Sequence, residues 1–246
     1  MVRYALVGLL RYALAGLLLA ALTLGAQETP QSEEGFRSLF NGKDLSGWTY
    51  RGSKENLDGQ TQTADGRFVV EAGVIVAKEK DKNGRGGIKV LDTVFTWPKD
   101  FELRLQFKAG LKADSGVYVR GAQLQVRDFP RRGEQKQLKK FKNDDWNELQ
   151  IIVRNQVTST VLNGKALTNR DNLQATFRDG KLSVATLNGK AVEVKSLTVR
   201  KGAVAECFVN GEFLEKMANI PENGPIGLQA ETGPFAFRNI RIKELK

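Results

Sequence analysis

The segment FELRLQFK, from Phe101 to Lys108, decides the class of the fold. Every second residue from Phe101 to Phe107 is apolar, and each residue between them is charged or carries an amide. Successive side chains of a β-strand point to opposite faces of the sheet, so this alternation predicts a strand with one face in a core and the other in water. An antiparallel sheet buried on one side is therefore expected here.

Short alternating runs of the same kind fill the chain from Gly66 to Leu245. Gly or Asn-Gly interrupts them every eight to twelve residues, and helical patterns are scarce. This spacing is typical of an all-β antiparallel sandwich. The Asn-Gly pairs that begin at Asn163, Asn188 and Asn210 each favour a two-residue hairpin turn, so three stacked hairpins are expected. The runs WNELQIIVRN and VTSTVLN are expected to be separate strands, as are SLTVR and AVAECFVN, whereas GGIKV is expected to be a turn.

The first 26 residues have the layout of a secretory signal peptide. Arg3 and Arg11 precede an apolar run from Tyr12 to Ala26, which predicts export to the periplasm or the extracellular space. An uncleaved N-terminal anchor is the alternative, although the run is shorter than the ~20 residues that a spanning helix needs. We expect a disordered stub at residues 27–35 and a single domain at residues 36–246, a length that one core can serve.

The composition excludes several kinds of site. The chain has no histidine and a single cysteine, so it cannot form a Ser-His-Asp or Cys-His centre, a histidine-ligated metal site or an internal disulfide. Cys207 is expected to be a small buried residue. The net charge of +10 favours anionic partners, although nucleic acid is not expected for an exported chain. The basic segment RRGEQKQLKKFK is either a solvated loop or a contact surface for an anionic polysaccharide, through Arg131, Arg132, Lys139 and Lys140.

A row of polar side chains marks the segment DSGVYVRGAQLQVRD as a candidate site. Gln123, Gln125 and Arg127 alternate with apolar residues and are expected to share one face with Tyr118 and Arg120. Amides and guanidinium groups supply planar hydrogen-bonding groups for sugar hydroxyls, and an aromatic ring covers the C–H face of a sugar. Three interpretations of the row stay open, which are an ordinary solvated sheet face, a face that binds a sugar without catalysis, and a catalytic face.

Several segments, in order and spacing, resemble the family of 3-keto-disaccharide hydrolases, also described as 3-keto-glycoside lyases and hydratases. They include FRSLFNGKDLSGW, FELRLQFK, DSGVYVRG, WNELQIIVRNQVTSTVLNG and the closing GPIGLQAETGPFAFRNIRIKEL. The resemblance spans most of the chain from Phe36 to Asn163 and resumes at Gly224. The stretch between, at about residues 165–223, is interpreted as a hairpin insertion.

The resemblance implies a concanavalin-like jelly-roll β-sandwich, an exported location and chemistry on oxidised sugars. In that chemistry the carbonyl at C3 acidifies the C2 proton, a base removes it, the glycosidic oxygen leaves, and hydration gives the free keto-sugar. Such a site needs a base, an acid and a group that stabilises the enolate, for which the resemblance makes a divalent metal a candidate.

The sequence departs from the family pattern at two strands. Gln123 stands where the family commonly has Glu, and Ala230 and Glu231 stand where it commonly has Asp and His. An amide does not accept a proton near neutral pH, so Gln123 can orient a hydroxyl but cannot act as a base. Glu231 and Asp128 remain as candidate catalytic carboxylates, and strand register decides where Glu231 points.

Gln229, in the same closing segment, is a further candidate for substrate binding. Three functions stay open at this point, and with them the question of whether the protein is an enzyme. It could cleave 3-keto-glycosides with Glu231 or Asp128 as the base, or it could be a glycan-binding module that has lost the acid. It could also be an extracytoplasmic scaffold that works through its hairpins and its basic loop.

Overall fold

The structure is a computed structural model that describes residues 33–79, 87–168, 170–179 and 181–246. The expected signal peptide lies outside these residues, as does most of the expected stub. The end of that stub is corrected, because Glu33 forms salt bridges with Arg104 (2.9 Å) and Arg241 (2.8 Å) and is held against the domain. Within the described ranges, no helix has the length and apolar character needed to span a membrane.

The regular secondary structure of the described chain is almost entirely antiparallel β-strand, as the alternating pattern predicts. The one helix among the described residues is α1 (Phe129–Arg132). The large sheet has the order β15 (Glu212–Ile220), β14 (Leu197–Val209), β9 (Asn147–Leu162), β6 (Phe101–Ala109), β17 (Phe235–Glu244), β4 (Val74–Ala77) and β3 (Phe68–Glu71), with β1 (Arg37–Ser38) on β17 and β10 (Lys165–Ala166) on β9. The second sheet has the order β2 (Trp48–Tyr50), β5 (Lys89–Thr93), β16 (Ile226–Ala230), β7 (Asp114–Val119) and β8 (Ala122–Arg127).

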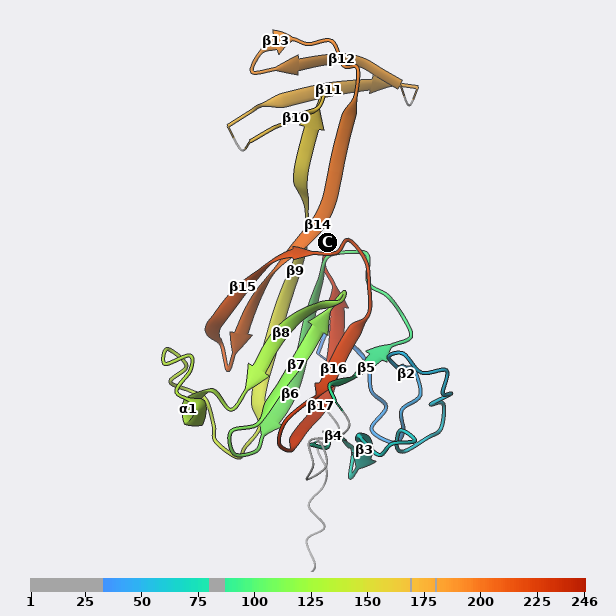
Figure 1. Ribbon diagram of the computed structural model, residues 1–246, viewed down its shortest axis with the longest axis vertical. Helices are drawn as coiled ribbons and strands as arrows, with labels where there is room; N and C mark the ends of the chain where they lie inside the picture. The colour runs from blue at the N-terminus through green and yellow to red at the C-terminus, as the bar shows by residue number, and fades with distance from the viewer. Residues whose placement is uncertain (1–32, 80–86, 169, 180) are drawn as a thin grey trace, which may run out of the picture. The chain divides into compact units, whose positions relative to one another are not determined.

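The two sheets pack on each other around one hydrophobic core, which makes a β-sandwich (Figure 1). In β6 the side chains of Phe101, Leu103, Leu105 and Phe107 are fully buried while the residues between them are half-buried, so the alternation of FELRLQFK is confirmed. Leu124 and Val126 of the second sheet belong to the same core. Strands far apart in the sequence become neighbours, with β17 beside β6 and β16 between β5 and β7, which is the crossed connectivity of jelly-roll sandwiches.

Two strands are longer than the sequence pattern suggests. WNELQIIVRN and VTSTVLN form the single strand β9, and β9 pairs with β14 along its length, from Leu149↔Val209 to Leu162↔Leu197. The polar residues near Gln156 interrupt the apolar alternation, although the backbone ladder continues through them. Cys207 lies in this ladder with no exposed surface, and burial raises the pKa of its thiol to about 12.

Beyond Gln156↔Gly202, the β9–β14 ribbon leads to a small three-stranded sheet of β11 (Leu173–Arg178), β12 (Lys181–Leu187) and β13 (Lys190–Ala191), as Figure 1 shows. We call residues 157–201 the paddle. Its buried residues Leu162 and Ala185 are not members of the main core, so the paddle has a small core of its own. The segment at 165–223, interpreted as one insertion, therefore consists of two parts. Its first part belongs to the paddle, and the chain from Ala203 onward lies in the large sheet.

All three Asn-Gly pairs form hairpin turns, as expected. They have positive φ at both residues, and they join β9 to β10, β12 to β13 and β14 to β15. The hairpins are not one stack, because the turn at Asn210 lies in the large sheet whereas the turns at Asn163 and Asn188 lie in the paddle.

Candidate functional site

The predicted row of polar residues lies on the outer face of the five-stranded sheet, which we call the polar face. Pairing of Gly116 with Gln125 and of Tyr118 with Gln123 puts these side chains on one side of β7 and β8. The residues between them, such as Val117 and Leu124, point into the core. Pairing of β16 with β7 brings Gln229 to the same face, opposite Gly116.

The glutamines of the polar face are bonded to one another in a row that crosses three strands. Gln123 Nε2 donates to Gln229 Oε1 at 2.9 Å and to Gln125 Oε1 at 3.2 Å. In the orientation that satisfies its neighbours, Gln125 Nε2 donates to Asp114 Oδ1 at 3.1 Å. Arg127 closes the row, because its Nε donates to the same oxygen at 2.8 Å. The row is thus a fixed set of amides and one ion pair rather than a set of independent solvated side chains.

Gln229 is the residue of this row whose side chain leaves a hydrogen-bond donor without a partner. Its side chain has no exposed surface, and its Nε2 has no hydrogen-bond partner in the described structure. A buried donor without a partner costs about 1–3 kcal/mol, so native proteins usually supply it with an ordered water or a ligand. Gly116 leaves room beside it, because a Cβ there would lie 2.8 Å from Gln229 Oε1 and 2.9 Å from Gln123 Nε2.

A second polar group, which sequence reasoning missed, lies on the same face. Arg51 Nε and Nη2 donate to the two carboxylate oxygens of Asp92, each at 2.7 Å, and these hydrogen bonds raise the pKa of Arg51. The Arg51 guanidinium also lies 4.4 Å from the centre of the Tyr118 ring, a cation–π distance. Gly227 lies beneath this pair, since a Cβ there would come within 2.4 Å of Asp92 Oδ1. Tyr118 is therefore already covered on one side by a cation.

The residues of GGIKV were expected to form a turn, and this is corrected by the structure. Lys89 and Val90 belong to β5, which lies between β2 and β16 and carries Asp92. The alternation in KVLDT is the signal that could have revealed this strand, and the glycines before it obscured that signal.

Arg120 does not lie with the other predicted substrate-binding residues. It occupies the β7–β8 turn with Gly121, at φ +52°, and this turn directs its side chain away from the polar face. Its guanidinium is buried, with Nη1 donating to Asn155 Oδ1 (2.7 Å) and Nη2 to the carbonyl of Lys99 (2.6 Å). Burial lowers the pKa of Arg120. The side chain therefore links the β7–β8 turn to Asn155 of β9 and to the backbone at Lys99 and Pro221.

Replacing Arg120 by methionine is expected to destabilise the domain by about 2–4 kcal/mol, because two carbonyl acceptors and Asn155 lose a charged donor in a buried site. Urea unfolding followed by circular dichroism would measure this. Arg154→Met is the matched control, since that exposed side chain forms a 3.5 Å surface ion pair and should cost less than about 1 kcal/mol. A loss below 1 kcal/mol for Arg120→Met would refute the structural role.

Asp128, one of the two candidate catalytic carboxylates, is fully buried at the start of α1. Its Oδ2 accepts from the backbone N–H of Lys112 (2.7 Å) and from Arg131 Nε (2.6 Å). The structure therefore places it in the loop framework beside α1. Asp128 therefore forms a structural ion pair with Arg131. It is not part of the row that contains Gln123 and Gln125.

Glu231, the other candidate, follows the last residue of β16 and is half-buried. The pairing of Leu228 with Val117 would, without interruption, bring Glu231 opposite Asp114, but Thr232 takes that position. One extra residue therefore enters the strand before Thr232 and breaks the alternation. Within the described part of the chain, Glu231 has no hydrogen bond or ion pair. Its carboxylate is thus uncommitted, two residues beyond Gln229 in the chain.

The carboxylates of the polar face do not fit a divalent metal. Both oxygens of Asp92 are occupied by Arg51, and Asp114 is shared by Arg127 and Arg132. Over the described residues, no three acidic, histidine or cysteine side chains gather in a metal-binding arrangement. Oxygen ligands already paired with arginines are poor donors for Mg²⁺ or Ca²⁺, so the described carboxylates of the polar face do not suit either ion.

A family model described as the 3-keto-alpha-glucoside-1,2-lyase-like domain matches residues 35–243, which is most of the chain. The protein therefore belongs to this family of carbohydrate-active, glycosyl hydrolase-like proteins. No curated protein matches the sequence.

Two crystal structures of presumed glycosyl hydrolases from Parabacteroides distasonis ATCC 8503 are similar to this chain. One has 18% identity and a TM-score of 0.49, over 85% of this chain and 99% of the other. The second has 17% identity and a TM-score of 0.46, over 87% and 95%. A β-glucanase from Bacillus licheniformis has 12% identity and a TM-score of 0.38, over 86% and 97%. Similarity at this level carries no conclusion about activity.

Proposed function

We propose that the polar face binds a sugar and that Gln229 is the residue on which this binding depends. The observation that carries the proposal is the buried, unpaired Nε2 of Gln229 beneath the row of amides. A sugar hydroxyl or keto oxygen that accepts from this donor would remove the cost of leaving it unpaired. Rotation of the half-buried Gln123 side chain would open the way to it.

The groups around Gln229 support a sugar as the ligand. Gln123 and Gln125 offer amide groups, and the partly exposed Arg51 offers donors beyond those bound to Asp92. Amides and guanidinium groups in a fixed plane suit the paired hydroxyls of a pyranose ring. Membership of a carbohydrate-active family points to the same class of ligand.

Calorimetric titration of the full chain with a 3-keto-glucoside and with the unoxidised glucoside tests the proposal. Binding of either sugar is expected, and tighter binding of the keto form would identify the keto oxygen as the partner of Gln229. No detectable binding of either sugar at millimolar concentration would contradict the proposed function.

Cleavage of 3-keto-glycosides is the second candidate function, and the uncommitted carboxylate of Glu231 together with the family favours it. Glu231 would remove the C2 proton, and the electron pair would move to the C3 carbonyl oxygen. The enolate would then re-form the carbonyl as the C1–O bond breaks, and the glycosidic oxygen would leave with a proton from water or from the protonated Glu231 carboxyl. Water would add to the C1=C2 bond to give the keto-sugar. Gln229 Nε2 would donate to the enolate oxygen.

Export of the protein remains a proposal that rests on residues 1–26 alone. N-terminal sequencing of the mature protein should begin at Gln27, and an intact Met1 would favour the retained anchor. Contact of the basic loop with an anionic polysaccharide is also a proposal. It loses support at two of its four residues, because Arg131 is paired with Asp128 and Asp144, and Arg132 with Asp114 and Glu134.

A further inference from the structure

The paddle concentrates the positive charge of the protein. Residues 157–201 contain eight Lys and Arg against three Asp and Glu, a net charge of +5, which is half of the +10 of the whole chain in less than a fifth of its length. In the described part of the chain, nearly all salt bridges join residues of the sandwich, and the paddle contributes Lys201–Glu222. The charge is therefore a local property of this segment rather than a general property of the surface.

Five of the paddle's eight cations form no salt bridge within the described part of the chain. Among the described residues, Lys165, Arg170, Arg178, Lys190 and Lys195 are exposed and form no salt bridge, while Lys201 lies 4.0 Å from Glu222 outside the paddle. Uncompensated like charges repel one another, which weakens a small β-sheet. The unpaired cations therefore do not stabilise the paddle. A bound anion from outside the chain would reduce their mutual repulsion.

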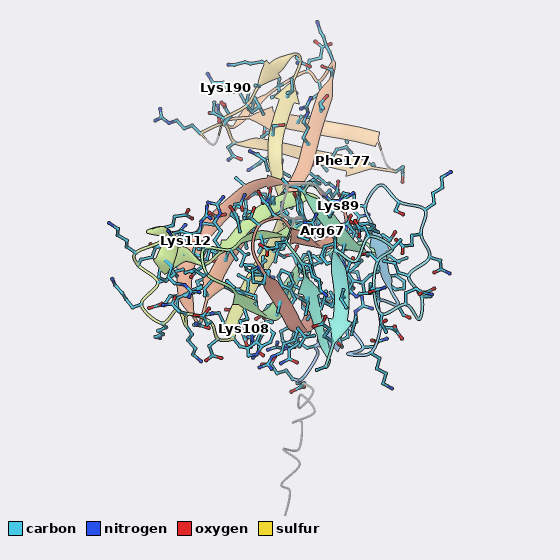
Figure 2. The ribbon with its side chains drawn as sticks, turned by 60° about the horizontal axis from the view of Figure 1, so that its bottom comes forward. Arg67, Lys89, Lys108, Lys112, Phe177 and Lys190 are labelled. Atoms are coloured by element: carbon cyan, nitrogen blue, oxygen red, sulfur yellow. The ribbon has the colours of Figure 1, made fainter. Side chains whose placement is uncertain are left out.

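The cations are spread over the paddle instead of being gathered at one tip. Lys165 lies in β10, Arg178 ends β11 and Lys190 begins β13, so charged residues occur at both ends of β12. Figure 2 shows Lys190 and Phe177 at different ends of the small sheet. A long, flexible polyanion can contact all of these positions at once.

We infer that the paddle is a binding surface for an acidic polysaccharide, whose repeated carboxylate or sulfate groups pair with the cations at both ends of its small sheet. This surface is separate from the polar face, and it does not depend on the proposed sugar binding at Gln229. It differs also from the basic loop, in which Arg131 and Arg132 are already paired within the chain.

Retention of the full chain on immobilised polygalacturonate, measured as a function of salt concentration, tests the inference. In the paddle variant Arg170, Arg178, Lys190 and Lys195 are all replaced by Gln. We expect its affinity at low salt to fall by about 10-fold or more, because four exposed contacts are lost, and the salt dependence to become shallower. Binding of a small glycoside at the polar face should not change.

The matched control replaces four exposed lysines of the sandwich, Lys43, Lys54, Lys136 and Lys216, by Gln, which removes the same net charge. The control should retain most of the wild-type affinity. Equal losses in the two variants would overturn the inference, because net charge alone would then explain binding. Retention that ignores salt, or binding to vesicles containing phosphatidylglycerol but not to polygalacturonate, would overturn it as well.

A charge-preserving variant separates a folding defect from a binding defect. Exchanging Arg170 and Arg178 for Lys, and Lys190 and Lys195 for Arg, keeps every cation and should keep polygalacturonate affinity within about 3-fold, since exposed pairing of this kind depends mainly on charge. Loss of affinity in this variant, with an unchanged melting temperature, would contradict a charge-based surface.

Discussion

Replacing Gly227 by alanine is expected to weaken sugar binding by about 100-fold. The added Cβ would lie 2.4 Å from Asp92 Oδ1, which is a clash. It would also lie 3.0 Å from Val90 and 3.1 Å from Tyr118, which is tighter than an ordinary contact. Asp92 is 6% exposed, so it cannot move aside without giving up its two hydrogen bonds to Arg51. Overpacking of this kind costs about 1–3 kcal/mol. The Arg51 side chain is 39% exposed, so water screens its pairing with Asp92 and the loss of that pair adds only about 1 kcal/mol. A total of about 3 kcal/mol corresponds to about 100-fold in affinity.

Gly59→Ala provides the matched control for that experiment. Gly59 has φ +74° and nothing within 4 Å of an added Cβ, so alanine there costs about 1 kcal/mol of backbone strain without touching the polar face. Calorimetric titration of both variants, with melting temperatures measured in parallel, separates site damage from general destabilisation. Similar affinities in the two variants would mean that the Arg51–Asp92 pair is not part of the binding site.

Replacing Glu231 by glutamine is expected to lower turnover of a 3-keto-glucoside by at least about 100-fold, because loss of a general base typically costs 10²–10⁴ in rate. Sugar affinity should change little, since the amide has the same shape and Glu231 has no partner within the described chain. Loss of substrate followed by chromatography measures turnover, and titration measures affinity.

Glu193→Gln is the control for this experiment, because that exposed residue lies in the paddle. Wild-type turnover in Glu231→Gln would remove Glu231 from the mechanism. If the wild-type protein binds the sugar but shows no turnover, cleavage fails as a function while sugar binding at the polar face stands.

Much of the fold could be predicted from sequence because it depends on local alternation. FELRLQFK, the glutamine run and the three Asn-Gly turns each carry their own signal, and all of them have the predicted structure. The continuous strands β9 and β14 could not be predicted, because their middle residues are polar and only pairing with each other keeps them extended. Tertiary pairing, rather than local preference, decides how far these strands extend.

The candidate site was predicted in part for the same reason. Gln123, Gln125 and Gln229 share a face because strand period and register fix it, and Tyr118 joins them through its pairing with Gln123. Arg120 was expected on this face, but a positive-φ turn lies at that residue, and a period of two says nothing about a turn. Arg51 and Asp92 are 41 residues apart and meet only in three dimensions, so no local pattern could reveal their pairing.

The central claim, that a sugar takes the unpaired donor of Gln229, is tested most directly by Gln229→Met. Methionine fills a similar volume and removes both the unpaired N–H₂ group and the Oε1 that accepts from Gln123. The relief of the unpaired donor and the loss of that hydrogen bond are of similar size, so the melting temperature of the free protein should change little. Affinity for the 3-keto-glucoside, measured by titration calorimetry, should fall by about 10-fold, as expected for the loss of one hydrogen bond to a neutral ligand. Gln60→Leu, an exposed site, should leave both quantities unchanged. Unchanged affinity in Gln229→Met would contradict the account.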